Sequence, residues 1–118
     1  MGITNNGLNR IRDLLVADIY NAALGTGTVA FATTNTGLGA TVASTISTPS
    51  VDTSSQQFTT AFQLGSTTAV GTVFAEIGTF VNSAGTVLLS RNTFVPSTHE
   101  NTEEWNMNTT YFIKRNVV

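Results

Sequence analysis

The apolar positions of this chain change their spacing near residue 19. Before it they recur every three or four residues, which is typical of one face of an amphipathic helix, and we predict a helix over about 5–17. Thr4 or Asn5 can cap its start, because a short side-chain oxygen accepts hydrogen bonds from the first free backbone N–H groups. A helix this short is marginal alone, so its apolar stripe must dock on the rest of the domain. The docking residues that we expect are Leu8, Ile11, Leu14 and Leu15.

From residue 19 onward apolar and polar residues alternate, as they do in strands with one buried face. We predict strands over 19–24, 41–48, 56–64 and 105–115. The third and fourth are the clearest. In the third, one face is made of Phe58, Thr60, Phe62 and Leu64. In the fourth, one face is made of Trp105, Met107, Thr109, Tyr111 and Ile113.

The segment 71–94 predicts a β-hairpin. Two apolar runs flank residues 82–85, a cluster whose Asn and Gly tolerate the left-handed backbone that hairpin turns need. The pairs that this turn would place opposite each other are Phe80 and Val87, Phe74 and Thr93, and Glu76 and Arg91. An acid and a guanidinium that face each other across two strands attract, so we predict a structural ion pair between Glu76 and Arg91.

Five or six short strands after one helix predict a mainly β protein, a small antiparallel β-sandwich or barrel with one N-terminal α-helix. A chain of 118 residues can build one core but not two lobes. We therefore expect a single structural domain over 1–118, with the helix at about 5–17 and the sandwich at about 19–115. The segment 95–104 is expected to be a polar loop.

Charge is scarce in this chain. Asp, Glu, Lys and Arg make up 10% of the residues, against roughly 25% in most soluble domains, and threonine alone outnumbers them. The formal net charge of -2 offers no basic stripe for phosphates, so we expect no nucleic-acid partner. No apolar run approaches the roughly 18 residues of a membrane span, and the N-terminus lacks the pattern of an export signal. We expect no membrane partner.

The stretch LGTGTVA at 24–30 has the letters of a dinucleotide-binding fingerprint. Such a fingerprint opens a helix in a βαβ unit, with an acid about 20 residues further on. Here a segment rich in Thr, Asn and Gly follows, with no helical period. We predict a turn between a strand and a Thr-rich segment, and no cofactor.

Two further patterns invite a chemical interpretation. The first is a cluster that could attract a divalent cation or supply a catalytic base, made of His99, Glu100, Glu103 and Glu104. One contiguous loop lacks the outer residues that orient metal ligands, and no G-x-S-x-G elbow presents a nucleophile to His99. We expect a solvated loop, no metal site, no catalytic residues and no enzymatic activity. The second is a set of strand aromatics without nearby Lys or Arg, which we place mainly in the core: Phe58, Phe62, Phe74, Phe80 and Phe94.

The order of several motifs resembles that of short structural proteins of tailed bacteriophages and related viruses. The motifs are ITNNGLNRIRDLL, ALGTGT, TGLGATV, FAEIGTF and GTVLLSRNTF. The corresponding pattern runs G-L-x-x-I-R-D-x-L, A-L-G-T-G-T, D-T-x-L, A-E-x-G-x-F and G-x-x-L-x-R-x-x-F. It covers roughly 4–38 and 73–94. Asn35 stands where the pattern usually has an acid.

The resemblance implies a non-enzymatic virion structural protein that assembles on the particle as a head decoration or a tail or fibre component. It implies other virion proteins as partners, a homo-oligomer, and a location on the virion after synthesis in the host cytoplasm. Short hydroxyl and amide side chains also suit a surface covered by neighbours, where desolvating Lys or Glu is costly. The alternative is a receptor- or glycan-binding module that uses exposed Tyr20, Tyr111 or Trp105.

Overall fold

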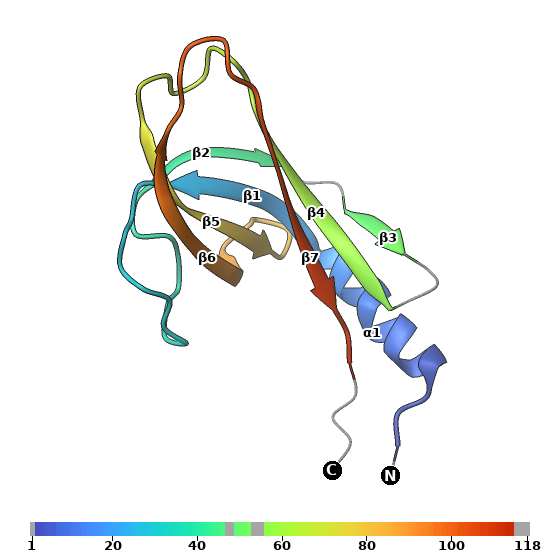
Figure 1. Ribbon diagram of the computed structural model, residues 1–118. Coiled ribbons are helices and arrows are strands. Elements are labelled where there is room, and N and C mark those ends of the chain that lie inside the picture. Colours follow the sequence, from blue (N-terminus) through green and yellow to red (C-terminus); the bar gives the residue numbers. More distant parts are fainter. Residues whose placement is uncertain (1, 47–48, 53–55, 115–118) are drawn as a thin grey trace.

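The computed structural model describes residues 2–46, 49–52 and 56–114. These residues form one helix and seven strands in two antiparallel sheets, packed as a sandwich (Figure 1). The elements are α1 (Asn5–Asp18), β1 (Ile19–Gly25), β2 (Thr41–Ile46), β3 (Ser50–Asp52), β4 (Gln57–Leu64), β5 (Val73–Val81), β6 (Val87–Thr98) and β7 (Trp105–Phe112). The expectation of a mainly β sandwich led by one helix is confirmed.

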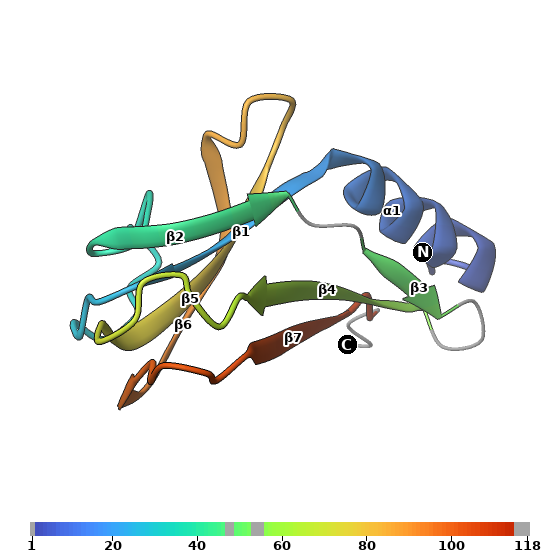
Figure 2. The ribbon, with the colours of Figure 1, turned by 90° about the horizontal axis from the view of Figure 1, so that it is seen from above.

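The two sheets form separate layers. The larger has the strand order β2-β1-β5-β6 and the smaller the order β3-β4-β7. Seen from above, α1 extends beyond one end of the larger sheet and lies near β3 and β4 (Figure 2). In the described part of the chain, β2 and β6 are the edges of one sheet and β3 and β7 those of the other.

The strands differ from the expected ones at several places, one of which is the expected strand 105–115, which ends at Phe112. β3 was not expected, because three residues are too few for an alternation to be visible. β6 continues to Thr98, through residues expected to be a polar loop. Pro96 is tolerated there because β6 is an edge strand, where one side of the backbone needs no partner. The expected strand 41–48 ends at Ile46, and residues 47, 48 and 115 lie outside the described residues.

Local hydrogen bonds define both ends of α1. The hydroxyl of Thr4 accepts a hydrogen bond from the backbone N–H of Gly7 at 3.1 Å, so Thr4 is the N-cap. At the other end, the N–H of Ile19 donates to the carbonyls of Leu15 and Val16. β1 begins at Ile19 itself, so the chain passes from helix to strand without a loop.

The buried stripe of α1 differs from the expected one. Leu8 and Arg12 are buried, and Leu15 is half-buried. Ile11 and Leu14, expected to dock the helix, are 45% and 56% exposed. At about 100° per residue, Leu8, Arg12 and Leu15 share a face from which Leu14 points away.

The hydrogen bonds of Arg12 explain why this face of α1, and not the expected one, is buried. Its Nη1 donates to the carbonyl oxygen of Asp52 on β3 at 3.3 Å, and its Nη2 pairs with Asp13 at 2.8 Å. The guanidinium is therefore hydrogen-bonded, which allows this basic side chain to be buried. A prediction from the apolar residues alone places Arg12 on the exposed face of the helix, and the structure shows that this is wrong.

The β5–β6 hairpin has the expected turn but another register. The side-chain oxygen of Asn82 accepts hydrogen bonds from the N–H groups of Ala84 and Thr86, so the turn extends to Thr86. Asn82 and Gly85 have φ angles of 78° and 64°, which Asn and Gly adopt at least cost. The observed pairs include Val81 with Val87, Phe80 with Leu88, Gly78 with Arg91, Glu76 with Thr93, and Phe74 with Ser97.

An irregularity in the pairing of β5 with β6 decides which side chains face the core. The register shifts between Phe74 and Glu76, where one β5 residue stands opposite the three β6 residues 94–96 and the regular alternation is interrupted. Phe74 and Ile77, three positions apart, therefore both belong to the core between the sheets. Glu76 turns to the opposite face of the larger sheet. The core itself joins both sheets and consists of Ala22, Leu24, Phe62, Leu64, Phe74 and Ile77.

The helix contacts generate a test with a matched control. Leu8→Ala should lower the free energy of unfolding by about 2–5 kcal/mol, because it leaves a cavity under α1. Leu14→Ala removes the same side chain from an exposed position of the same helix, and should stay within about 0.5 kcal/mol of the parent chain. Urea unfolding of the two variants measures the difference. Equal losses would contradict the described face of the helix.

Candidate functional site

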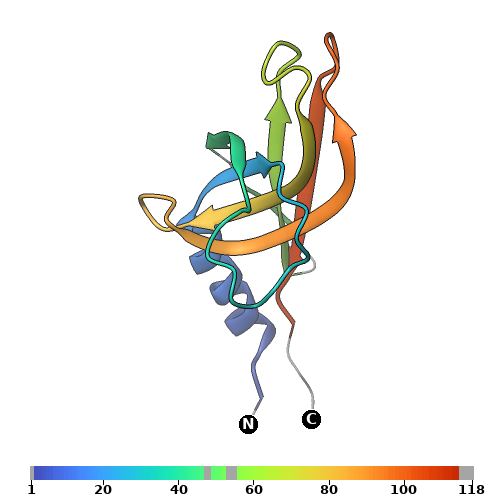
Figure 3. The ribbon, with the colours of Figure 1, turned by 90° about the vertical axis from the view of Figure 1, so that its left-hand side faces the viewer.

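The carboxylate of Glu76 is the centre of the best-defined polar site in the described residues. It lies on the outer face of the larger sheet, beside the register shift between β5 and β6, and the segment 26–40 between β1 and β2 folds across this face (Figure 3). Glu76 is 0% exposed. A buried charge is costly unless hydrogen-bond donors surround it.

Four donors surround this carboxylate. Oε2 accepts from the backbone N–H of Gly27 at 2.6 Å and from that of Ala40 at 3.0 Å. Oε1 accepts from the N–H of Gly39 at 2.8 Å and from Nε of Arg91 at 2.8 Å. Two oxygens offer about four acceptor positions, so all are in use. The arrangement holds the loop and leaves no lone pair for a substrate proton or an added ligand.

The glycines of ALGTGT and TGLGATV make room for the carboxylate. A Cβ at Gly27 would lie 2.4 Å from Oε2 of Glu76 and 2.9 Å from Cα of Gly39. A Cβ at Gly25 would lie 2.5 Å from the same oxygen and 2.5 Å from the carbonyl oxygen of Ala40. The stretch LGTGTVA, expected to be a turn, thus presents the backbone N–H of Gly27 to an anion. That anion is a side chain of the same protein.

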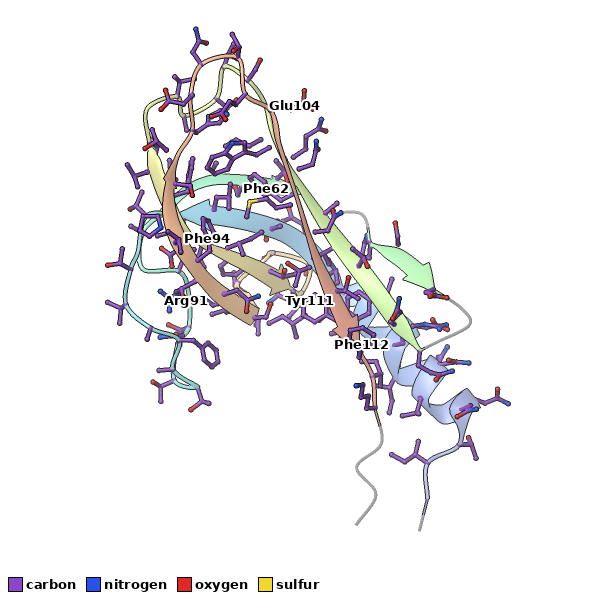
Figure 4. All side chains as sticks on the ribbon, in the orientation of Figure 1. Phe62, Arg91, Phe94, Glu104, Tyr111 and Phe112 are labelled. Atoms are coloured by element: carbon purple, nitrogen blue, oxygen red, sulfur yellow. The ribbon has the colours of Figure 1, made fainter. Side chains whose placement is uncertain are left out.

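Arg91 extends this site along the loop. Beyond its bond to Glu76, Nη2 donates to the carbonyl of Val29 at 2.6 Å and Nη1 to Oδ1 of Asn35 at 3.2 Å. Figure 4 shows Arg91 on the side of β6 near the loop. The expected ion pair is present, but not between directly opposite residues. Arg91 faces Gly78, two positions from Glu76, so the contact is diagonal.

The charge state of Glu76 follows from its surroundings. Burial alone raises the pKa of a carboxyl group, because it disfavours the charged form. The hydrogen bonds from Arg91 and from the backbone N–H groups of Gly39, Ala40 and Gly27 outweigh this effect, and the pKa of Glu76 is lowered. The residue is therefore ionised in the folded protein at neutral pH.

The acidic residues Glu100, Glu103 and Glu104 lie in an exposed loop, as expected, but His99 beside them does not. His99 is fully buried, and its backbone bonds to Gly71 and Thr72. Its Nε2 lies 2.7 Å from the carbonyl oxygen of Glu103, which can only accept, so Nε2 carries a proton. The carboxylate of Glu103 accepts from the N–H of Glu100. Within the described residues, no three His, Asp or Glu side chains gather as metal ligands.

The aromatic candidates have different surroundings. Tyr20 is 37% exposed on β1. Tyr111 stacks on Phe58 with ring centroids 4.8 Å apart, and its hydroxyl hydrogen-bonds to Ser90, which joins β7 to β6. Trp105 is half-buried at the margin of the core. The alternation in the sequence places these aromatic residues on strands, but it does not predict which residues they contact.

Comparison of the chain with protein-family models, curated proteins and solved structures finds no match. Within the described residues, no helix has the length and apolar content needed to cross a bilayer. What the protein does is therefore inferred from its own residues.

The lowered pKa of Glu76 predicts a pH-dependent stability. A carboxyl whose pKa is lower in the folded than in the unfolded state stabilises fully above the unfolded value of about 4.3. That contribution is lost as the pH falls through the folded value. At pH 7, Glu76→Gln should cost about 3–5 kcal/mol, because it leaves Arg91 buried without its anion. Denaturation series across the acid range should show the two proteins converging below the unfolded pKa, whereas parallel curves would contradict the role of the charge.

The packing of the loop predicts a difference between two glycines. Gly27→Ala forces a methyl group against the carboxylate and should cost about 1–3 kcal/mol, a usual penalty for overpacking. Gly37→Ala is the control, since no atom lies within 4 Å of a Cβ at that position of the same loop. Thermal denaturation of the two variants measures the effect. Similar melting temperatures would show that the loop does not hold Gly27 against Glu76.

Proposed function

We propose that this chain is a non-enzymatic structural protein of a tailed-virus particle, on which it assembles as a head decoration or a tail or fibre component. The arrangement of the resembling motifs supports this. ALGTGT supplies Gly25 and Gly27, TGLGATV supplies Gly39, FAEIGTF supplies Glu76, and GTVLLSRNTF supplies Arg91. These pieces meet at one carboxylate. The pattern therefore describes a way of holding a loop, as a structural protein requires.

Position 35 fits this interpretation. The resembling pattern usually has an acid there, and this chain has Asn35. Its Oδ1 accepts from Arg91 and from the backbone N–H of Ala32. An amide oxygen and a carboxylate oxygen can both accept these bonds. The substitution thus keeps the acceptor that positions the guanidinium.

Exposed apolar side chains are the observation that carries the assembly role. They occur on the helix, on the loop and on the strands, in a chain with only 10% charged residues. Among them are Ile11, Leu14, Val29 at 75% exposed, Phe31, Val95 at 82% exposed, and Phe112. Single exposed apolar residues are ordinary, but such a number on a small, weakly charged surface is typical of a protein covered by neighbours.

Unpaired strand edges give such neighbours a place to bind. In the described residues β6 pairs only with β5, and β7 only with β4, so the outer edge of each is not paired with a further strand. An incoming strand could extend either sheet. Identical subunits that meet in this way form closed, symmetric oligomers in most cases.

Immunogold labelling of purified particles tests the proposal. An antibody against this chain should label the particles, and prior incubation of the antibody with purified protein should abolish the label. Label over the head would identify a decoration protein, whose addition should protect capsids against heat or low salt. Label on the tail would identify a fibre or tail component, whose removal should reduce adsorption. A purified chain that neither binds particles nor copurifies with them contradicts both.

A further inference from the structure

The edge strand β7 is long, regular and without the features that usually protect an edge. Its eight residues keep one register with β4 and include no charged residue and no proline. By contrast, β6 has Pro96 and register shifts, β3 has three residues, and β2 has six. Figure 2 shows β7 at the margin of the molecule, where no described strand or helix lies beyond it. An edge of this kind pairs readily with another strand.

The hydrogen bonds to β4 determine which backbone groups of β7 point outward. The N–H of Ile113 donates to the carbonyl of Gln56, in the register that the strand pair keeps throughout. In an antiparallel ladder, every second residue bonds to the same neighbouring strand. The odd-numbered residues of β7 therefore bond to β4. The backbone groups that point to the outer edge belong to Asn106, Asn108, Thr110 and Phe112.

We infer that β7 pairs antiparallel with β7 of a second copy of this chain, across a two-fold axis. The backbone groups of both edges are satisfied when outward-pointing residues stand opposite each other. The register that we propose places Asn106 opposite Phe112 of the second copy and Asn108 opposite Thr110. Thr109 then faces its own counterpart on the axis. The smaller sheets of the two copies become one continuous sheet, and the contact closes on itself.

The two charges that flank β7 select this register. Glu104 directly precedes the strand, Lys114 follows it after Ile113, and both are exposed. In the described residues Lys114 forms no ion pair, and its Nζ lies 5.2 Å from the centroid of the Phe112 ring. In the proposed register Glu104 faces Lys114 of the second copy, and symmetry repeats this attraction.

Other registers satisfy the backbone but not the charges. A shift by two residues in either direction keeps the outward-pointing groups paired, yet places Glu104 and Lys114 opposite uncharged residues. The edge is thus complementary to itself in one register, with an acid at one end and a base at the other. This self-complementarity identifies a second copy of the chain as the partner.

The core-facing side chains of β7 match in the same register. Trp105 stands opposite Ile113 of the second copy, and Met107 stands opposite Tyr111. All four are half-buried in the single chain. Pairing removes part of their remaining apolar surface from water, which favours association.

As the contact by which subunits assemble, this pairing rests on the proposed function, but the two can fail separately. Gold labelling reports whether the chain is on particles, whereas the experiments below report contact between two purified copies in solution.

An introduced cysteine tests the register, because the chain has none of its own. Thr109→Cys places two thiols in a non-hydrogen-bonded pair on the axis, with Cα atoms about 4.5 Å apart, within the range of a disulfide. Under mild copper-catalysed oxidation it should cross-link at least about tenfold faster than Asn106→Cys, because thiols held together have a high effective concentration. The thiols of Asn106→Cys would lie at opposite ends of the paired segment. Non-reducing electrophoresis measures both rates, and equal rates overturn the proposal.

Charge exchange tests the same contact without a cross-link. In sedimentation equilibrium at low salt, the parent chain should approach twice its mass of 12.4 kDa. We expect a dissociation constant of about 100 µM or lower. Lys114→Glu should weaken the dimer about tenfold, because it sets two acids opposite each other twice in every dimer. Combining it with Glu104→Lys restores opposite charges and should restore the dimer.

Arg10→Glu is the matched control. It changes the net charge by the same amount at an exposed position of α1, away from β7, and should leave the dimer unchanged. The three charged positions are exposed, so the variants should fold, and circular dichroism checks this. A parent chain that is mainly monomeric at about 1 mM overturns the proposal. So does a double variant that dimerises no better than Lys114→Glu alone.

Discussion

The rest of this fold depends on one buried anion. An enclosed carboxylate without donors would be protonated or would expel the segment that covers it. Glu76 receives four donors, and three are backbone N–H groups of the segment 26–40. That segment is rich in Gly and Thr, and its large apolar side chains Val29 and Phe31 are exposed. Its conformation is therefore maintained by charge and hydrogen bonds, while the opposite face of the same sheet is maintained by apolar packing.

Much of the secondary structure could be predicted because its signals are local. The three-and-four spacing located α1, and the alternation of two located β4 and β7, since each depends on neighbours in the chain. The face of α1 could not be predicted in this way, because the partner of Arg12 lies on β3, a strand too short to recognise. The hairpin register depended on a longer turn and on the register shift opposite residues 94–96 of β6, and no residue type in the sequence marks that shift.

The sequence predicted that Glu76 pairs with Arg91. It did not predict that this carboxylate holds the segment 26–40. An acid and an arginine in one hairpin suggested attraction, and the glycines suggested a turn. The glycines enclose the acid only in the folded structure, and nothing in the motif ALGTGT indicates that its partner is Glu76. His99 was missed for the same reason: a histidine among glutamates looks solvated, and only the folded structure shows its backbone bonds to Gly71 and Thr72 and its ring against Trp105. The close spacing of the glycines was the one available sign that a backbone approaches another group closely.

The distances along the chain between these partners bear on how the protein folds. Glu76 bonds to residues that precede it by 49, 37 and 36 positions. During synthesis the segment 26–40 leaves the ribosome before β5 exists, so its N–H groups stay hydrated until the hairpin arrives. Contacts of such separation carry a large loop-closure entropy and slow the search for the native topology. We therefore expect the outer layer of the larger sheet to be completed late, after β5 and β6 have paired.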